Sequence, residues 1–198
     1  MAGIIKTNTV QLGDSATATQ NFVLTTNVDG TATLARGNAD STTQNILTIA
    51  ADGTVKLPNS IVPAFSAYNS ANQTISSGVF TKMILNTKEF DTNNNFDNTT
   101  NYRFTPTVAG YYQVNHYLDS TASTSTTSTH TYIYKNGVQF KQGVYIAGGA
   151  LTRISCSSLI YLNGTTDYIE FYAYITATTA VIVGNSQNAC SAILISRT

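Results

Sequence analysis

The stretch Phe104–Tyr117, FTPTVAGYYQVNHY, predicts a β-strand with large side chains on both faces. After Gly110 the side chains alternate with the period of two that a strand imposes. One face carries Tyr112, Val114 and His116, and the other carries Tyr111, Gln113, Asn115 and Tyr117. Pro106 and Gly110 mark the turn that leads into the strand. Because both faces hold aromatic residues, we expect one to pack into a core and the other against a second copy of the chain.

The composition favours β-structure and argues against two classes of partner. Charged residues are only 10% of the 198 residues, against roughly 25% in typical soluble domains, and the formal net charge is zero. Nucleic-acid binding and electrostatic membrane docking both need clustered lysine and arginine, so neither is expected. Residues that favour pleated surfaces, such as Thr, Tyr and Val, are abundant. We therefore expect an all-β protein whose solubility comes from uncharged polar side chains.

The sequence predicts synthesis in a cytoplasm and no membrane insertion. The opening MAGIIKTNTVQLGDSATATQ has no long apolar region of the kind found in secretory signal peptides. No apolar run approaches the ~18 residues that a membrane-spanning helix needs. Release from the cell would then follow another route, such as lysis.

Cys156 and Cys190 are the only cysteines. Cytoplasmic synthesis favours two small buried thiols, although a single disulfide stays open because only geometry can decide it. The two distant histidines, His116 and His130, do not complete a zinc site with them.

Residues 1–60 differ from the remainder and predict an attachment segment. They contain one aromatic residue and repeat the pattern DGTxxL at Asp29–Leu34 and Asp52–Leu57. Asp-Gly between alternating apolar residues predicts a β-hairpin, and two such hairpins hold too little apolar material for a core of their own. Their apolar residues are therefore candidates for anchoring on other proteins: Phe22, Leu24, Leu34, Leu47 and Ile49. The alternative is a flexible arm. Leu57–Ser60 has the composition of a linker.

From Ile61 onward, short strand signals follow one another without helical periodicity. Asn136-Gly137 and Asn163-Gly164 predict hairpin turns, and Asp119–Ser128 predicts a polar loop. This pattern favours an antiparallel sandwich or barrel. The expected strands are Ala64–Tyr68, Gly78–Leu85, Tyr102–Thr105, Gly110–Leu118, Thr129–Lys135, Val138–Ile146, Thr152–Leu162, Asp167–Tyr174 and Ala189–Ser196.

One polar stretch has the spacing of a calcium loop. Oxygen ligands recur at alternate positions, at Asp91, Asn93, Asn95 and Asp97. Hard cations need six to eight such oxygens, but phenylalanine and tyrosine replace the loop's usual glycine and final glutamate. The alternative is a surface loop whose Asn and Asp side chains satisfy turns. Calcium is the only candidate cofactor.

No catalytic motif is present, which predicts that the chain is not an enzyme. His116 is expected to pack within its strand, and His130 to be exposed. Tyrosines among Asn, Ser and Thr residues are candidates for stacking on sugars, with core packing as the alternative: Tyr145, Tyr168, Tyr172 and Tyr174.

Several motifs from Ala64 onward resemble the complement C1q and tumour-necrosis-factor-like family. They are AFSA at 64–67, Phe80 followed by Asn86, Phe104 followed by Gly110 and Tyr112, YIYKNGVQF at 132–140, and the late segments SSLIYLNGTTDYIEF and SAILIS. The chain departs from the family in a longer segment between Phe90 and Phe104, and in Val114, His116 and Ala192 where aromatic residues are usual. The resemblance implies a ten-stranded jelly roll over residues 61–198 that assembles as a homotrimer.

In that family one sheet face lines the threefold interface. The resemblance therefore makes the strand after Gly110 a candidate interface element, through Tyr111, Tyr112, Val114 and Tyr117. The alternative is that the tyrosines belong to the core of a monomer. The DGT pieces and TLARGN at Thr33–Asn38 resemble anchoring segments of bacteriophage tail and head fibre proteins.

The two resemblances together predict a trimeric bacteriophage virion protein, such as a tail fibre. Residues 1–60 would bind other virion proteins, and a knob at 61–198 would bind a glycan or protein of the host surface. The alternatives are a capsid decoration or head-fibre protein that stabilises the particle, and a bacterial C1q-like adhesin. A polysaccharide hydrolase would need paired carboxylates in a cleft, which the sequence does not place.

Overall fold

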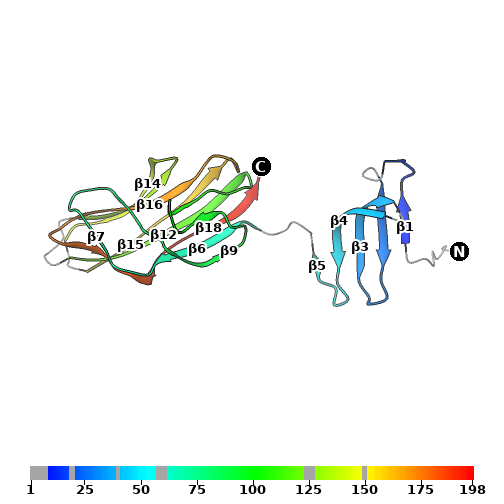
Figure 1. The fold of residues 1–198 in the computed structure, drawn as a ribbon, viewed down its shortest axis with the longest axis horizontal. Coiled ribbons are helices and arrows are strands. Elements are labelled where there is room, and N and C mark those ends of the chain that lie inside the picture. The colour runs from blue at the N-terminus through cyan, green and yellow to red at the C-terminus, as the bar shows by residue number, and fades with distance from the viewer. Residues whose placement is uncertain (1–8, 18–20, 39–40, 57–61, 123–127, 149–150) are drawn as a thin grey trace. The chain divides into compact units, whose positions relative to one another are not determined.

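The computed structural model describes residues 9–17, 21–38, 41–56, 62–122, 128–148 and 151–198. The chain divides into two compact units, Met1–Ile61 and Val62–Thr198, which are described separately (Figure 1). All regular structure in the described ranges is β-strand, so the all-β prediction is confirmed. In these ranges no helix has the length and apolar character needed to cross a membrane. The predicted linker Leu57–Ser60 lies outside the described residues.

The N-terminal unit is a five-stranded antiparallel sheet in chain order. The two predicted hairpins are present, as the β2–β3 and β4–β5 pairs. The two hairpins join into one sheet because β3 also pairs with β4, and β1 adds to the sheet by pairing with β2. The strands are β1 (Thr9–Leu12), β2 (Phe22–Thr26), β3 (Ala32–Asn38), β4 (Ser41–Ile49) and β5 (Val55–Lys56).

The repeated DGT sequence forms the same turn twice. Asp29 Oδ1 accepts the backbone N–H of Thr31 at 2.9 Å, and Asp52 Oδ1 accepts that of Thr54 at 2.8 Å. The glycine that follows each aspartate has a φ of 82° or 83°, a left-handed value that favours glycine. These backbone hydrogen bonds lower the pKa of both carboxyl groups from their ordinary value. The sequence repeat is therefore a repeat of turn geometry.

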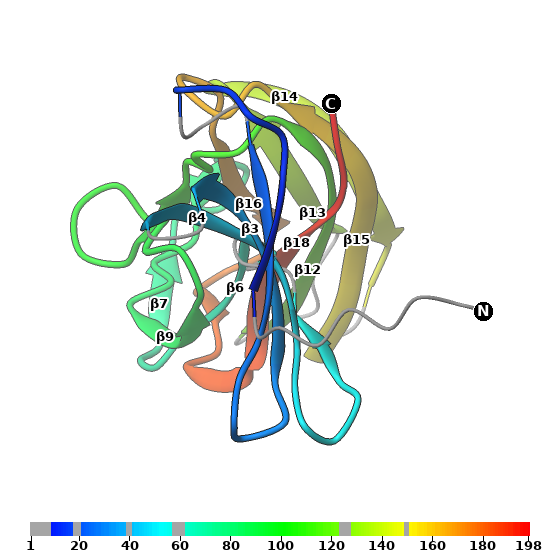
Figure 2. The ribbon, with the colours of Figure 1, turned by 90° about the vertical axis from the view of Figure 1, so that its right-hand side faces the viewer.

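The C-terminal unit, called the knob below, consists of two antiparallel sheets. The front sheet contains β7 (Gln73–Ile75), β17 (Ala180–Ile182), β12 (Gly110–Ala122), β18 (Asn185–Arg197), β6 (Ala64–Asn69) and β9 (Thr87–Asp91) in this order, with β15 (Leu151–Leu162) paired to β12. The back sheet contains β10 (Phe96–Asp97), β11 (Arg103–Phe104), β16 (Ile169–Thr176), β13 (Ser128–Lys135) and β14 (Val138–Ile146), with β8 (Thr81–Lys82) paired to β16. Figure 2 shows how strongly the strands of the knob curve.

The core of the knob is an aromatic stack between the sheets. The Phe65 ring lies 4.5 Å from that of Phe96 and 4.7 Å from that of Phe104. Tyr112 contacts Phe104 edge-on, and its hydroxyl donates a hydrogen bond to a backbone carbonyl oxygen at 2.7 Å. Burial raises the pKa of Tyr112 to about 12. This tyrosine therefore belongs to the interior of its own chain.

The predicted alternation along β12 is confirmed, but the interface prediction for Tyr112 and Val114 is wrong. Both side chains are fully buried in the knob core, whereas Tyr111 and Tyr117 are exposed. The reason is that the back sheet covers the face that carries Tyr112. The sequence shows two faces but does not show which one meets a second sheet.

Gly110 begins β12 beside β18, and only glycine fits there. A Cβ atom at this position would lie 2.2 Å from the backbone oxygen of Ser196 and 2.6 Å from a methyl carbon of Leu194. The residue predicted as a turn glycine is therefore required by the close approach of two strands.

Most predicted strands are present, and two segments differ. The strand predicted at Gly78–Leu85 is reduced to Thr81–Lys82, because only these two residues pair with β16. The polar loop predicted from Asp119 begins later, because β12 continues to Ala122 in pairing with β15 and β17. The rest of that predicted loop, residues 123–127, lies outside the described residues.

One of the two predicted Asn-Gly turns is a hairpin. Asn136 and Gly137 have φ values of 54° and 76°, as a type I′ turn requires, and they join β13 to β14. Asn163-Gly164 does not form a hairpin, because β15 and β16 belong to different sheets. Asn163 instead accepts hydrogen bonds from three backbone N–H groups that follow it.

Candidate functional site

The front sheet exposes a contiguous apolar surface, which we call the front-face patch. It consists of Tyr111, Leu159, Tyr161, Ile193 and Ile195, with exposed fractions between 40% and 62%. Strand register brings these residues together, since Tyr111 lies opposite Tyr161, and Gln113 lies opposite both Leu159 and Ile193. The two tyrosine rings are 5.5 Å apart. Contiguous apolar patches on soluble proteins mark interaction sites.

Next to the patch, the exposed face of β12 carries uncharged polar side chains. Gln113 Nε2 donates to Ser157 Oγ at 2.7 Å, and Ser157 Oγ donates to Asn115 Oδ1 at 2.9 Å. These side chains satisfy one another across the strands. Tyr117 lies beyond them, roughly 20 Å along the strand from Tyr111 at about 3.4 Å per residue. Both tyrosines are exposed, and their place in a trimer interface stays a prediction.

The sequence reasoning did not find the patch residues on β15 and β18. Their signal is the unbroken apolar runs Leu159–Leu162 and Ala192–Ile195, which do not alternate with polar residues. In each run the buried residues face the core, and the intervening ones are exposed. A strand that is apolar on both faces is typical of a sheet covered on both sides.

The N-terminal sheet also exposes an apolar face, which we call the anchor face. Register places Leu24, Leu34 and Leu47 in one row across three strands, and Phe22 and Ile49 on the same side. Phe22, Leu24 and Ile49 are all at least 39% exposed. Figure 1 shows strands of this unit side by side, in the order that the register gives. The five predicted anchoring residues therefore share one face, while their role in attachment stays a prediction.

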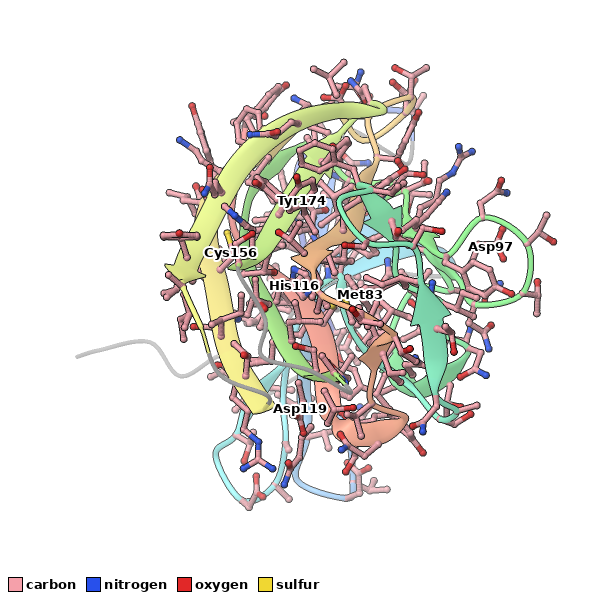
Figure 3. The ribbon with its side chains drawn as sticks, turned by 90° about the vertical axis from the view of Figure 1, so that its left-hand side faces the viewer. Met83, Asp97, His116, Asp119, Cys156 and Tyr174 are labelled. Atoms are coloured by element: carbon pink, nitrogen blue, oxygen red, sulfur yellow. The ribbon has the colours of Figure 1, made fainter. Side chains whose placement is uncertain are left out.

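The predicted calcium loop uses its carboxylates to close its own turns. Asp97 lies at a loop that projects from the knob (Figure 3). Asp97 accepts backbone hydrogen bonds from Thr99, Thr100 and Asn101, all at 3.0 Å, and these bonds lower the pKa of its carboxyl group far below the ordinary value. Asp91 accepts hydrogen bonds from the backbone N–H groups of Asn95 and Phe96, and it forms an ion pair with Lys88 at 3.3 Å.

The two amides of the candidate calcium set are also engaged. Asn93 Oδ1 accepts a hydrogen bond from Thr92 Oγ1 at 3.1 Å, and Asn95 Oδ1 accepts the backbone N–H of Thr107 at 3.3 Å. In the part of the chain that the structure describes, no three His, Cys, Asp or Glu side chains are grouped so as to hold a metal ion. Calcium binding by this loop stays a prediction, and the geometry favours the alternative of a turn-forming loop.

We expect that chelation of calcium leaves the stability of the knob unchanged. The melting temperature of the full chain, measured by calorimetry, should be the same with EGTA and with excess calcium. Asp97→Ala should lower it in both conditions, because three backbone N–H groups lose their acceptor. The free energy of unfolding should fall by roughly 1 kcal/mol, since the exposed N–H groups can bond to water instead. A rise in the wild-type melting temperature with calcium, absent in Asp97→Ala, would contradict this reading.

The four tyrosines considered for sugar stacking all make ring contacts within the knob. Tyr172 stacks on Tyr134 at 3.9 Å, and the Arg103 guanidinium lies 4.4 Å above the Tyr168 ring. Tyr145 and Tyr174 both contact His130, and Tyr174 also contacts Phe80. His130 is only partly exposed in this aromatic cluster. Sugar binding by these tyrosines stays a prediction.

His116 is buried at the centre of the knob and packs against apolar groups. Its Nε2 lies 2.7 Å from Met83 Sδ, and its Nδ1 pairs with the Thr131 hydroxyl (Figure 3). Burial lowers its pKa to about 3. The ring therefore stays neutral at ordinary pH, as expected for a packing residue.

Cys156 and Cys190 are free and buried, which agrees with the favoured sequence interpretation. Both lie opposite His116 in the register of β12, one on β15 and one on β18. With a strand between them they are roughly 10 Å apart, beyond the ~7 Å Cα separation that a disulfide tolerates. Burial raises the pKa of both thiols.

No protein-family model and no curated protein sequence matches the chain. Solved structures match the knob. Murine APRIL at pH 8.0 aligns with a TM-score of 0.53 at 8% identity, over 68% of this chain and 99% of that one. The fold of the knob is a C1q/TNF-like jelly roll. The globular domain of zebrafish complement 1qA (TM-score 0.49, 15% identity, 69% and 99% coverage) and the PRD1 vertex protein P5 (0.49, 15%, 68% and 97%) are also similar.

The jelly roll carries more strands than the ten that the resemblance implied. Its described residues form thirteen, from β6 to β18. The sequence reasoning missed the short strands β7, β10 and β17, of two or three residues each, and β9, whose residues are polar or partly exposed. The jelly roll places the front-face patch on three adjacent strands, β15, β12 and β18.

Proposed function

We propose that this chain is a homotrimeric, non-enzymatic structural protein of a bacteriophage virion. The N-terminal unit attaches it to the particle, and the jelly-roll knob binds the host surface, as in a tail fibre or similar appendage. The observation that supports this proposal is that each unit exposes one apolar sheet face, the front-face patch in one and the anchor face in the other.

The front-face patch has the chemistry of a permanent interface between copies. Its members are tyrosine, leucine and isoleucine, and the polar groups beside it on β12 are uncharged and hydrogen-bonded to one another. Interface cores are enriched in aromatic residues and depleted in charge. A threefold arrangement closes on itself and leaves no patch exposed. Among closed assemblies we propose the trimer, because the resemblance of the sequence to the C1q and tumour-necrosis-factor-like family implies a homotrimer.

The anchor face fits attachment to a different protein. A single-layer sheet of this size has little core, since Val23 and Ala35 are the only hydrophobic residues that are buried in its described part. Docking of the face that carries Phe22 and Leu24 on a larger body would remove that apolar area from water. The resemblance of its DGT turns to phage fibre anchors supports a virion protein as the partner.

The buried state of the most reactive side chains supports a non-enzymatic role. His116, Cys156 and Cys190 are the groups best suited to a base or nucleophile, and all three are enclosed in the core. Burial lowers the pKa of His116 and raises the pKa of both thiols, which favours the neutral form of each group. The knob is thus proposed to act through its surface.

The virion assignment is tested by co-sedimentation with purified particles. The full chain should sediment with the particles, and a chain that begins at Val62 should not. Leu24→Lys, in the anchor face, should also be lost from the particles, whereas Val28→Lys, at a fully exposed turn, should be retained. Particles that lack the wild-type chain, or that retain the shortened one, would overturn the proposal. The purified chain should also bind host cells. If the particles retain the chain but it does not bind host cells, a capsid decoration protein is favoured instead.

A further inference from the structure

A hollow of about 390 Å³ opens on the knob at the end of β12 that lies away from the front-face patch. This volume lies within the roughly 300–1,000 Å³ of small-molecule sites. Residues of β12, β14, β15 and β18 line it, among them Tyr117, Asp119, Val144 and Arg153. The lining joins apolar and aromatic surface to a single carboxylate and a single guanidinium.

Asp119 is the unusual member of this lining. Its side chain is 4% exposed, and its Oδ2 lies 3.4 Å from both Arg153 Nε and Asn185 Nδ2. Its Oδ1 is buried and has no hydrogen-bond partner among the residues that the structure describes. A buried acceptor without a donor costs stability, so native proteins keep such groups rarely. The oxygen lacks a donor but is enclosed, so a donor from outside the chain reaches it only when the Asp119 side chain turns toward the hollow.

The backbone of Asp119 is held rigidly. Asn188 Nδ2 donates to the Asp119 carbonyl oxygen at 2.7 Å, the Val183 N–H donates to the same oxygen at 3.0 Å, and Asn188 Oδ1 accepts the Asp119 N–H. These residues adjoin a register break in β18 between Asn185 and Ala189. Strand irregularities of this kind often aim a side chain at a functional site. The backbone that carries the carboxylate is thus fixed before any ligand arrives, which reduces the entropy cost of binding.

We propose that this hollow binds a neutral saccharide, and that the Asp119 side chain turns from its long 3.4 Å contacts with Arg153 and Asn185 to accept a hydrogen bond from a sugar hydroxyl. Arg153 balances the carboxylate charge and is largely exposed, so it can donate to a neighbouring sugar oxygen. The exposed ring of Tyr117 and the side chain of Val144 offer an apolar surface for the C–H face of the sugar. The proposal rests on the proposed host-binding function and names its ligand class.

In this proposal Tyr117 contacts the saccharide, and the trimer interface lies at the other end of β12, around Tyr111. The two tyrosines are separated by roughly 20 Å of strand. A knob can therefore close its front-face patch and keep the hollow open.

The test is a titration of the full chain with D-glucose, D-galactose, L-rhamnose and N-acetyl-D-glucosamine, by calorimetry and ligand-observed NMR. We expect at least one sugar to bind with a millimolar dissociation constant. Tyr117→Ala and Asp119→Asn should each weaken binding about tenfold or more, as expected when one stacking or hydrogen-bonding contact is lost. The matched control is Phe90→Ala, since Phe90 and Tyr117 are aromatic residues that are 50% and 53% exposed. It should bind as the wild type does.

Several outcomes would overturn the site. They are no binding of any of the four sugars, equal binding by wild type, Tyr117→Ala and Asp119→Asn, or binding of glycine or L-lysine in place of sugars. If Asp119→Asn fails to fold, Tyr117→Ala decides alone, because its side chain is exposed. Native mass measured on the same samples separates the two proposals. A trimer that binds no sugar overturns only the site, and a monomer that binds sugar overturns only the assembly.

Discussion

A Leu159→Lys chain is expected to be a monomer of 21.2 kDa, whereas the wild-type chain has about three times that mass. Leu159 lies in the front-face patch and is 54% exposed in the single chain. Lysine at this position therefore costs the monomer little. In the trimer it would bring an ammonium group from each copy into an apolar interface, with a desolvation penalty of several kcal/mol per charge. Assembly should be lost while the fold is retained.

Two further variants control this experiment. Ile193→Lys changes the patch from β18 and should also give a monomer. Val138→Lys places the same charge on the back sheet, at a residue that is 68% exposed, and should remain trimeric. Urea unfolding of all three at one protein concentration reports whether each variant folds. A trimeric Leu159→Lys chain would show that the patch is not the interface.

The knob is expected to lose stability in mild acid because of His116. In the folded state its pKa is lowered to about 3, whereas in the unfolded state it keeps the ordinary value of 6.5. Below pH 6.5 the unfolded chain therefore binds a proton that the folded chain excludes. The free energy of unfolding should fall by about 1.4 kcal/mol for each pH unit between 6.5 and 3, and should not change through this group above 6.5. Burial lowers the pKa of His130 as well, which adds a smaller loss of the same sign.

Urea unfolding at about pH 7.5, 6 and 5 measures this dependence. The carboxyl groups with lowered pKa values titrate below 3.8, so they contribute little in this range. His116→Gln should remove most of the slope, whatever its effect on absolute stability, and His130→Gln should remove only a small part. A wild-type stability that is equal at the two ends of the range would contradict the buried neutral histidine.

The sequence predicts those features that depend on local pattern. The alternation in β12, the turn at Asn136-Gly137 and the five anchor-face residues follow from spacing along a single strand or turn. The sharing of a face by Leu24, Leu34 and Leu47 was not itself predicted. The first DGT turn sets Leu24 opposite Leu34, whereas Leu47 joins them through the pairing of β3 with β4. Local physics therefore gave the two hairpins of the N-terminal unit, but neither strand β1 nor the pairing of β3 with β4 that joins the hairpins into one sheet.

Features that depend on distant segments could not be predicted in this way. Tyr112 and Val114 are buried because the back sheet, with Phe104 and Phe171, covers their side of β12. Asn163-Gly164 has the composition of a hairpin, yet its flanking strands pair with different neighbours. The hollow at Asp119 needs an irregularity in β18, some 66 residues away in the sequence. No pattern around Asp119 indicates that one of its oxygens is left without a donor.

The native mass of the wild-type chain, measured by light scattering after size exclusion, tests the central claim most directly. It should be measured for the full chain and for a chain that begins at Val62, the start of the knob unit. The proposal predicts a trimer for both, since the front-face patch lies on the knob. A monomeric mass for the chain that begins at Val62 would contradict it. The exposed faces of β12, β15 and β18 would then be free of other copies, and any assembly would depend on the anchor face.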